Sequence, residues 1–94
     1  MFQAIKHKTK SEWTIKNSKY SFKEDWILQA YKLGHKKYLD WVAFLDSEFN
    51  DKVSLIREYY ICPEEKIFSE PAGVKVIFSD LKEAQKYCKI LNEV

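Results

Sequence analysis

Apolar and polar residues alternate in two short segments near the N-terminus. Residues 2–7 alternate with period two, and residues 12–16 do the same, with Trp13 and Ile15 on one side. Such alternation is typical of a strand with one buried face. The polar residues 8–11 between the segments lack the Asn-Gly pair that marks the tightest turns. We therefore predict an N-terminal β-hairpin with Trp13 facing inward.

A helical spacing follows the hairpin. Residues 21–24 (SFKE) match the capping box that begins many helices. Apolar residues then recur every three or four positions, with Ile27 and Tyr31 widening the apolar stripe. Gly34 stands where a left-handed C-terminal cap belongs. The pattern predicts a helix over residues 22–33.

Residues 38–45 (YLDWVAFL) fit two kinds of element. Leu39 and Trp41 belong to an alternating strand pattern, while the same segment also contains apolar residues at helical spacing. We favour the strand, because the polar residues 46–51 look like a turn and residues 53–61 are rich in β-branched and aromatic types. Two strands joined by a turn are the prediction for this part of the chain.

The last third contains three further signals. A turn is expected at Pro63, after which residues 66–68 can run back beside the preceding strand. Residues 74–78 (VKVIF) read as a short strand. Asp80 begins an acidic variant of the capping box, which predicts a final helix.

These elements define the predicted fold class, which is α+β. We expect a small, mostly antiparallel sheet, built from the N-terminal hairpin and a meander and packed with two helices, about residues 22–33 and 80–93. A chain of 94 residues suits one domain. The prediction is therefore a single compact α+β domain spanning residues 1–94.

Composition bears on compartment and origin. Hydrophobic residues make up 46% of the chain, which favours a folded domain, yet no stretch approaches the ~20 apolar residues of a membrane span. We expect no membrane partner and, without a secretory signal pattern, a cytoplasmic location in which Cys62 and Cys88 are free thiols. Fifteen lysines accompany a single arginine. Because lysine codons are AT-rich, this bias indicates a low-GC bacterium, or a phage or mobile element that lives in one.

Charge is divided unevenly along the chain. Residues 1–37 hold nine lysines and three acids, a balance of +6, whereas residues 38–94 hold seven Lys and Arg and eleven acids, a balance of −4. Such polarity can orient a small protein on nucleic acid or on an acidic protein face.

The basic N-terminal segment is the first candidate site. Lysines neutralise phosphates and aromatic faces stack on unpaired bases, so the segment could hold a single strand without reading its sequence. The competing interpretation is that the lysines confer solubility and the aromatic rings are core. The candidate residues of this segment are Lys6, Lys8, Lys10, Trp13, Lys16 and Lys19.

Two further features are candidates for binding. Fifteen aromatic residues are more than a small core easily hides, so we predict a protein-binding surface on the sheet near Trp41, Tyr59 and Tyr60. A second helix or a homodimer partner could cover that face instead. The cationic residues 35–37 follow the predicted helix end, where they complement the helix dipole and extend the basic patch.

Catalytic and cofactor motifs are missing from the sequence. His7, His35, Cys62 and Cys88 have no metal-ligand spacing, and two glycines cannot build a phosphate-cradling loop. We expect no enzyme, no cofactor and no metal site. The leading hypothesis is a small non-catalytic interaction protein, an inhibitor or accessory factor of phage or mobile-element origin that acts on host or nucleic-acid-handling machinery through a charge-polarised surface. The alternative is direct, sequence-independent nucleic-acid binding through the N-terminal hairpin.

Overall fold

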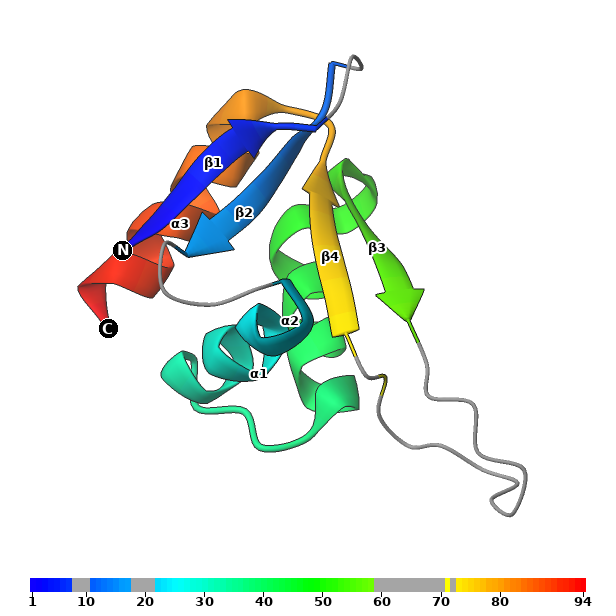
Figure 1. Ribbon diagram of the computed structural model, residues 1–94, viewed down its shortest axis with the longest axis vertical. Helices are drawn as coiled ribbons and strands as arrows, with labels where there is room; N and C mark the ends of the chain where they lie inside the picture. Colours follow the sequence, from blue (N-terminus) through cyan, green and yellow to red (C-terminus); the bar gives the residue numbers. More distant parts are fainter. Residues whose placement is uncertain (8–10, 18–21, 59–70, 72) are drawn as a thin grey trace.

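The computed structural model describes residues 1–7, 11–17, 22–58, 71 and 73–94 (Figure 1). Four strands form one sheet, and three α-helices and a short 3-10 helix accompany it within these residues. The strands are β1 (Phe2–Lys6), β2 (Trp13–Asn17), β3 (Val53–Glu58) and β4 (Gly73–Phe78). The helices are α1 (Phe22–Lys32), α2 (Tyr38–Phe49), η1 (Asn50–Lys52) and α3 (Leu81–Glu93). The prediction of an α+β fold is confirmed.

The sheet is antiparallel throughout, with strand order β1-β2-β4-β3. Pairing between β1 and β2 extends over five residue pairs and that between β3 and β4 over six. In contrast, β2 meets β4 at only two pairs, Trp13 with Phe78 and Thr14 with Ile77. Beyond that point the two strands diverge, and α1 lies beside the N-terminal half of β4 (Figure 1).

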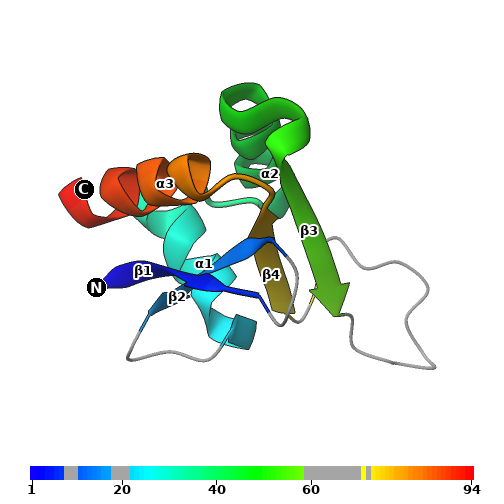
Figure 2. The ribbon, with the colours of Figure 1, turned by 90° about the horizontal axis from the view of Figure 1, so that it is seen from above.

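Two helices cover one face of the sheet. Figure 2 shows α3 over β1 and β2 and α2 next to β3, on the same side. Three rings fill the space between these helices and β4, with centroid distances of 5.0 Å for Phe49 to Phe78, 5.7 Å for Phe49 to Tyr87 and 5.6 Å for Phe78 to Tyr87. All three residues are buried, and each such side chain contributes about 1.5–3 kcal/mol through burial. The aromatic residues thus build the core.

Several predicted elements are confirmed. The N-terminal hairpin corresponds to β1 and β2, and the predicted first and last helices correspond to α1 and α3. Gly34 has a φ of 85°, the left-handed conformation expected after the end of α1. Asp80 is the N-cap of α3, where its carboxylate accepts a 2.9 Å hydrogen bond from the backbone N–H of Lys82.

The strand predicted for residues 38–45 is wrong, because this segment is the start of α2. Its buried residues are Tyr38, Trp41, Leu45 and Phe49, which recur every three or four positions and all face the core. Leu39, which the alternating pattern placed with Trp41, is 70% exposed. The predicted turn after this segment is also helical as far as Phe49, so the described residues contain three α-helices rather than two.

Other predictions concern segments outside the described residues. These are the capping serine at position 21, the strand continuation over residues 59–61 and the return strand at residues 66–68.

Candidate binding surface

The corner between α1 and α2 is shaped by the way α1 ends. The backbone N–H of Gly34 donates to the carbonyl of Tyr31 at 3.0 Å, and that of His35 donates to the carbonyl of Ala30 at 2.8 Å. These bonds satisfy carbonyls of the last turn and reverse the chain at the left-handed glycine. His35 and Lys36 are therefore held against the side of α1.

A half-enclosed hollow of about 180 Å³ lies at this corner. Sites for small molecules typically measure ~300–1,000 Å³, so this hollow suits a single side chain rather than a cofactor. Its lining comes from one side of α1 and from the loop that follows. The lining residues are Trp26, Ile27, Ala30, Tyr31, His35 and Lys36.

Trp26 forms the inner wall of the hollow. The residue is only 4% exposed, and its ring packs edge-on against Tyr38 at 5.3 Å and beside Trp41 at 5.7 Å. Its indole Nε1 is buried without a hydrogen-bond partner. A buried donor left unpaired costs about 1–3 kcal/mol. Trp26 is thus the one described residue with a buried side-chain donor or acceptor that the fold leaves unsatisfied.

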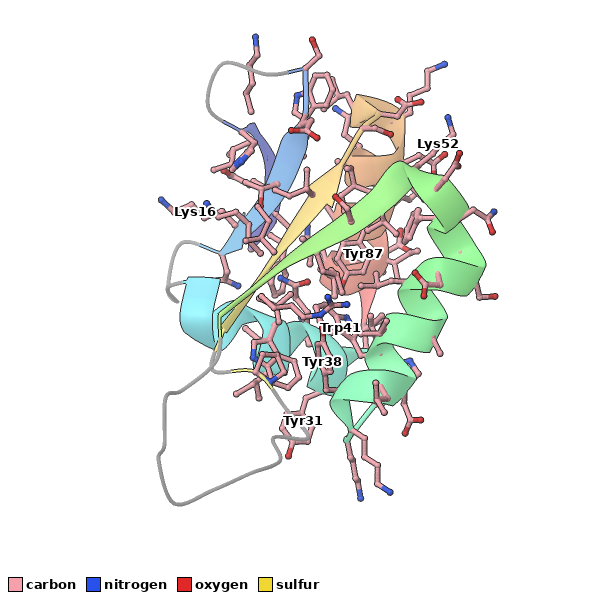
Figure 3. All side chains as sticks on the ribbon, turned by 90° about the vertical axis from the view of Figure 1, so that its right-hand side faces the viewer. Lys16, Tyr31, Tyr38, Trp41, Lys52 and Tyr87 are labelled. Atoms are coloured by element: carbon pink, nitrogen blue, oxygen red, sulfur yellow. The ribbon has the colours of Figure 1, made fainter. Side chains whose placement is uncertain are left out.

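The rim of the hollow is apolar and open to solvent. Tyr31 is 61% exposed and Ile27 is 45% exposed, and Tyr31 lies at the outer edge of the molecule in Figure 3. The sequence pattern predicted that both residues widen the buried stripe of α1, which is wrong. The buried side of α1 is formed instead by residues that include Trp26 and Ala30, and α1 packs mainly against β4.

Cationic groups flank this apolar rim. The His35 ring lies 5.5 Å from the Phe44 ring of α2, which fixes it at the mouth of the hollow. Lys36 and Lys37 follow it and are exposed. The sequence predicted that residues 35–37 complement the helix dipole and extend the basic patch. Ile27 and Tyr31 are exposed, lie one helical turn apart and are adjacent to the loop that contains residues 35–37. Together with that loop they form a candidate site.

The sequence predicted a binding surface on the sheet near Trp41, but Trp41 lies neither on the sheet nor at the surface. It belongs to α2, is fully buried, and its Nε1 donates a 3.0 Å hydrogen bond to the Tyr87 hydroxyl. That hydroxyl in turn donates to Oε1 of Gln29 at 2.8 Å. The three side chains link α2, α3 and α1 through the core, with Trp41 and Tyr87 at its centre in Figure 3.

The two described lysines of the hairpin do not converge on one face. Lys6 and Lys16 are both exposed, but strand alternation places them on opposite faces of the hairpin. Lys6 pairs with Trp13 on the face toward the helices, whereas Lys16 pairs with Gln3 on the other face. Trp13 is half-buried and packs against the core, so it is only partly available for stacking. Lys8, Lys10, Lys19, Tyr59 and Tyr60 lie outside the described residues.

Cys88 and Tyr87 are two buried titratable residues of α3. Burial raises the pKa of the Cys88 thiol to about 11 and raises that of the Tyr87 hydroxyl further above its ordinary value. Both groups are therefore protonated at neutral pH, and neither is a poised nucleophile or base. The described part of the chain holds no cluster of three or more potential metal ligands. None of its helices is long and apolar enough to cross a membrane.

Comparison with known proteins supplies no relative: no protein-family model, curated protein or solved structure matches this chain.

Proposed function

We propose that this chain is a small non-catalytic interaction protein that binds an acidic surface of a protein partner. The binding site is the α1–α2 surface, which consists of Ile27, Tyr31, His35, Lys36 and Lys37. The observation that supports the proposal is the exposure of a tyrosine and an isoleucine that line a hollow, beside His35 and two exposed lysines.

Each part of the α1–α2 surface has a role in binding. Tyrosine is enriched at protein interfaces because its ring supplies apolar contact area and its hydroxyl remains able to form hydrogen bonds. The neighbouring lysines steer an acidic partner toward the site and select against basic ones. Apolar contacts therefore supply affinity, while the cations supply orientation.

Origin and role form the finer part of the proposal. The strong preference for lysine over arginine supports a phage or mobile element of a low-GC bacterium as the source. A small domain of this kind acts as an inhibitor or accessory factor in the host cytoplasm, where its target belongs to the host or to nucleic-acid-handling machinery.

Direct nucleic-acid binding through the hairpin receives less support from the geometry. Lys6 and Lys16 face opposite sides of the hairpin, and Trp13 is committed in part to the core. A strand of nucleic acid needs its cations and stacking ring on one face. The protein partner is therefore the proposal, and nucleic acid is an outcome of its test.

Photo-crosslinking tests the proposal. A benzophenone-bearing amino acid is placed at Tyr31 or, as a matched control, at Ile56, which is 51% exposed on β3. Each protein is irradiated in an extract of a low-GC bacterium, and adducts are identified by mass spectrometry. We expect an adduct with an acidic protein from position 31 only, which is lost when Lys36→Glu is added. Equal adducts from both positions would remove the α1–α2 surface as the site, and a nuclease-sensitive adduct would favour nucleic acid.

A further inference from the structure

We infer that this chain forms a twofold-symmetric dimer through the β3 edge, which is the side of β3 (Val53–Glu58) that faces away from β4. In this dimer the two β3 strands pair antiparallel, and α2 of each copy lies beside α2 of the other. The inference goes beyond the proposed function, because the partner is a second copy of this chain and the contact lies on the side of α2 that faces away from α3.

The backbone of β3 directs hydrogen-bonding groups away from the sheet along this edge, which faces the viewer in Figure 3. Among the described residues β3 pairs with β4 alone. The backbone N–H of Ser79 donates to the carbonyl of Lys52 at 2.9 Å, so these two residues form a hydrogen-bonded pair of the ladder. Because such pairs alternate with non-hydrogen-bonded pairs, Val53 and Leu55 direct their N–H and C=O groups outward. A further strand can therefore add to the sheet here.

The two edges of the sheet differ in how they are protected. In β1, the Asn92 side chain accepts a 2.9 Å hydrogen bond from the N–H of Phe2 and donates one of 3.0 Å to its carbonyl. This amide occupies backbone groups that another strand would need. In β3, the segment Val53–Ile56 (VSLI) contains no charged residue and no proline, which commonly discourage edge pairing. The β3 edge is therefore the one at which strand pairing is expected.

The helix above this edge adds an exposed apolar flank. Trp41 and Glu48 of α2 face α3, the first through a hydrogen bond and the second through an ion pair. Leu39 and Ala43 lie on the opposite flank of the helix. Both are exposed, Leu39 to 70%. Because β3 is the last strand of the sheet and α3 covers β1 and β2, this flank lies on the side of the β3 edge (Figure 2).

The helix and the strand run in opposite directions, which fixes their relative level. The Tyr38 hydroxyl accepts a hydrogen bond from Nε of Arg57, so the start of α2 lies at the end of β3. Leu55 is two residues before Arg57, about 7 Å along a strand. Between four and five helical residues, at about 1.5 Å each, cover the same distance. Val42 is therefore approximately level with Leu55.

Charges on α2 select a second copy in antiparallel orientation as the partner. Lys37 is exposed at the start of α2, and Asp46 is exposed two turns after Leu39 and on the same flank. If the twofold axis passes beside Leu55, Lys37 of each copy comes level with Asp46 of the other, because the two residues lie about 5–8 Å from Val42 in opposite directions along the helix. A parallel pair would instead place lysine beside lysine.

The same axis gives a consistent strand register. Leu55 then lies opposite Leu55 of the second copy, and Ser54 lies opposite Ile56 of the second copy on the other face of the sheet. Pairing covers part of the Ile56 side chain, which is 51% exposed in one chain. A shift of one residue would bring outward-directed backbone groups opposite inward-directed ones, so it is excluded.

Two measurements test the dimer. Sedimentation equilibrium should show a mass that rises with concentration from 11.3 kDa to twice that value and no further. Amide hydrogen exchange followed by nuclear magnetic resonance should show that the N–H of Leu55 becomes protected only as the dimer forms. The N–H groups of Ser54 and Ile56 bond to β4 and should be protected at every concentration.

Matched variants test the contacts on α2. Leu39→Lys should abolish the dimer, whereas Ile27→Lys, at a 45% exposed position of α1, should leave it intact. Lys37→Glu and Asp46→Lys should each weaken the dimer ~10-fold, since each change affects two symmetric charge pairs. The double variant Lys37→Glu/Asp46→Lys should restore the dimer. Circular dichroism checks that each variant is folded.

Three results would overturn the inference. These are a mass of 11.3 kDa at every concentration, assembly that continues beyond two copies, and a dimer in which the N–H of Leu55 stays unprotected. A double charge variant that is no tighter than the single variants would also overturn it. Crosslinking at position 31 reports the acidic partner independently, so failure of the dimer is distinguishable from failure of the proposed function.

Discussion

Replacement of Tyr87 by phenylalanine should destabilise the protein strongly while leaving its shape intact. The substitution removes a single hydroxyl, which accepts from Nε1 of Trp41 at 3.0 Å and donates to Oε1 of Gln29 at 2.8 Å. All three side chains are buried. Without the hydroxyl, Trp41 loses its acceptor and Gln29 loses its donor, and water cannot readily replace it in the packed core.

The magnitude follows from the two groups left unpaired. Each orphaned buried polar group costs about 1–3 kcal/mol, so the two groups together should lower the free energy of unfolding of Tyr87→Phe by about 2–6 kcal/mol. A domain of this size is stable by ~5–15 kcal/mol. Because 1 kcal/mol corresponds to about 4–8 °C for domains of 60–100 residues, the melting temperature should fall by at least roughly 8 °C.

Urea unfolding followed by circular dichroism measures this effect, with Tyr31→Phe as the control. The Tyr31 ring is exposed, so its loss of a hydroxyl should change stability by less than ~0.5 kcal/mol. The double variant Tyr87→Phe/Gln29→Met also removes the amide that Tyr87→Phe leaves without its donor. Its loss of unfolding free energy should therefore be about 1 kcal/mol smaller than the sum of the losses of the two single variants. Equal stabilities of Tyr87→Phe and Tyr31→Phe would refute the view that this hydrogen-bond chain stabilises the core.

Two further predictions concern pH and the end of α1. Burial raises the pKa of Cys88 to about 11 and raises that of Tyr87 still further. In the unfolded chain these groups have their ordinary pKa values, ~8.5 for the thiol and ~10 for the phenol. Above those values the unfolded chain loses protons that the folded chain keeps. The free energy of unfolding should therefore be constant below about pH 8.5 and should fall above it, by at most ~1.4 kcal/mol per pH unit for each group. Urea unfolding between pH 8 and 10.5 should show that this free energy falls less steeply with pH for Cys88→Ala than for the native protein. Equal pH dependence of the two proteins would contradict the raised pKa of Cys88. Gly34→Ala should lower the free energy of unfolding by about 1–2 kcal/mol, because an added Cβ meets nothing within 4 Å and only the φ of 85° opposes it. Thermal melts should show that Gly34→Asn recovers part of this loss of stability. An alanine variant as stable as the native protein would show that the backbone at Gly34 adopts another conformation.

The sequence predicted an element correctly where the spacing of apolar residues and the capping residues both indicated the same type of secondary structure. In α3, for example, Asp80 caps the first turn, as the acidic capping box predicted. The segment from Tyr38 to Phe49 was ambiguous because its aromatic and aliphatic residues satisfy periods of 2 and 3.6 at once. Tertiary packing resolved it, since a helix brings Trp41 and Leu45 to the same buried face.

The candidate site was harder to predict because it depends on where α1 meets the sheet. Ile27 and Tyr31 look like core residues in sequence, but both are exposed because α1 turns Trp26 and Ala30 toward the core where it packs on β4. The unpaired N–H of Trp26 has no sequence signature at all. It results from how the ring packs against Tyr38 and Trp41, whose own polar atoms have other partners.

The charge division along the chain does not translate directly into a charged face. Strand alternation sends Lys6 and Lys16 to opposite sides of the hairpin, so the lysines of the first strands act as separate charges. The segment after Gly34 differs, because Lys36 and Lys37 are consecutive in the chain and both are exposed. Charges separated by less than a Debye length of ~8 Å reinforce one another at physiological salt, whereas more distant ones are screened. Among the described residues, Lys36 and Lys37 are therefore neighbouring cations beside an apolar rim, which supports the proposal that this surface binds an acidic partner.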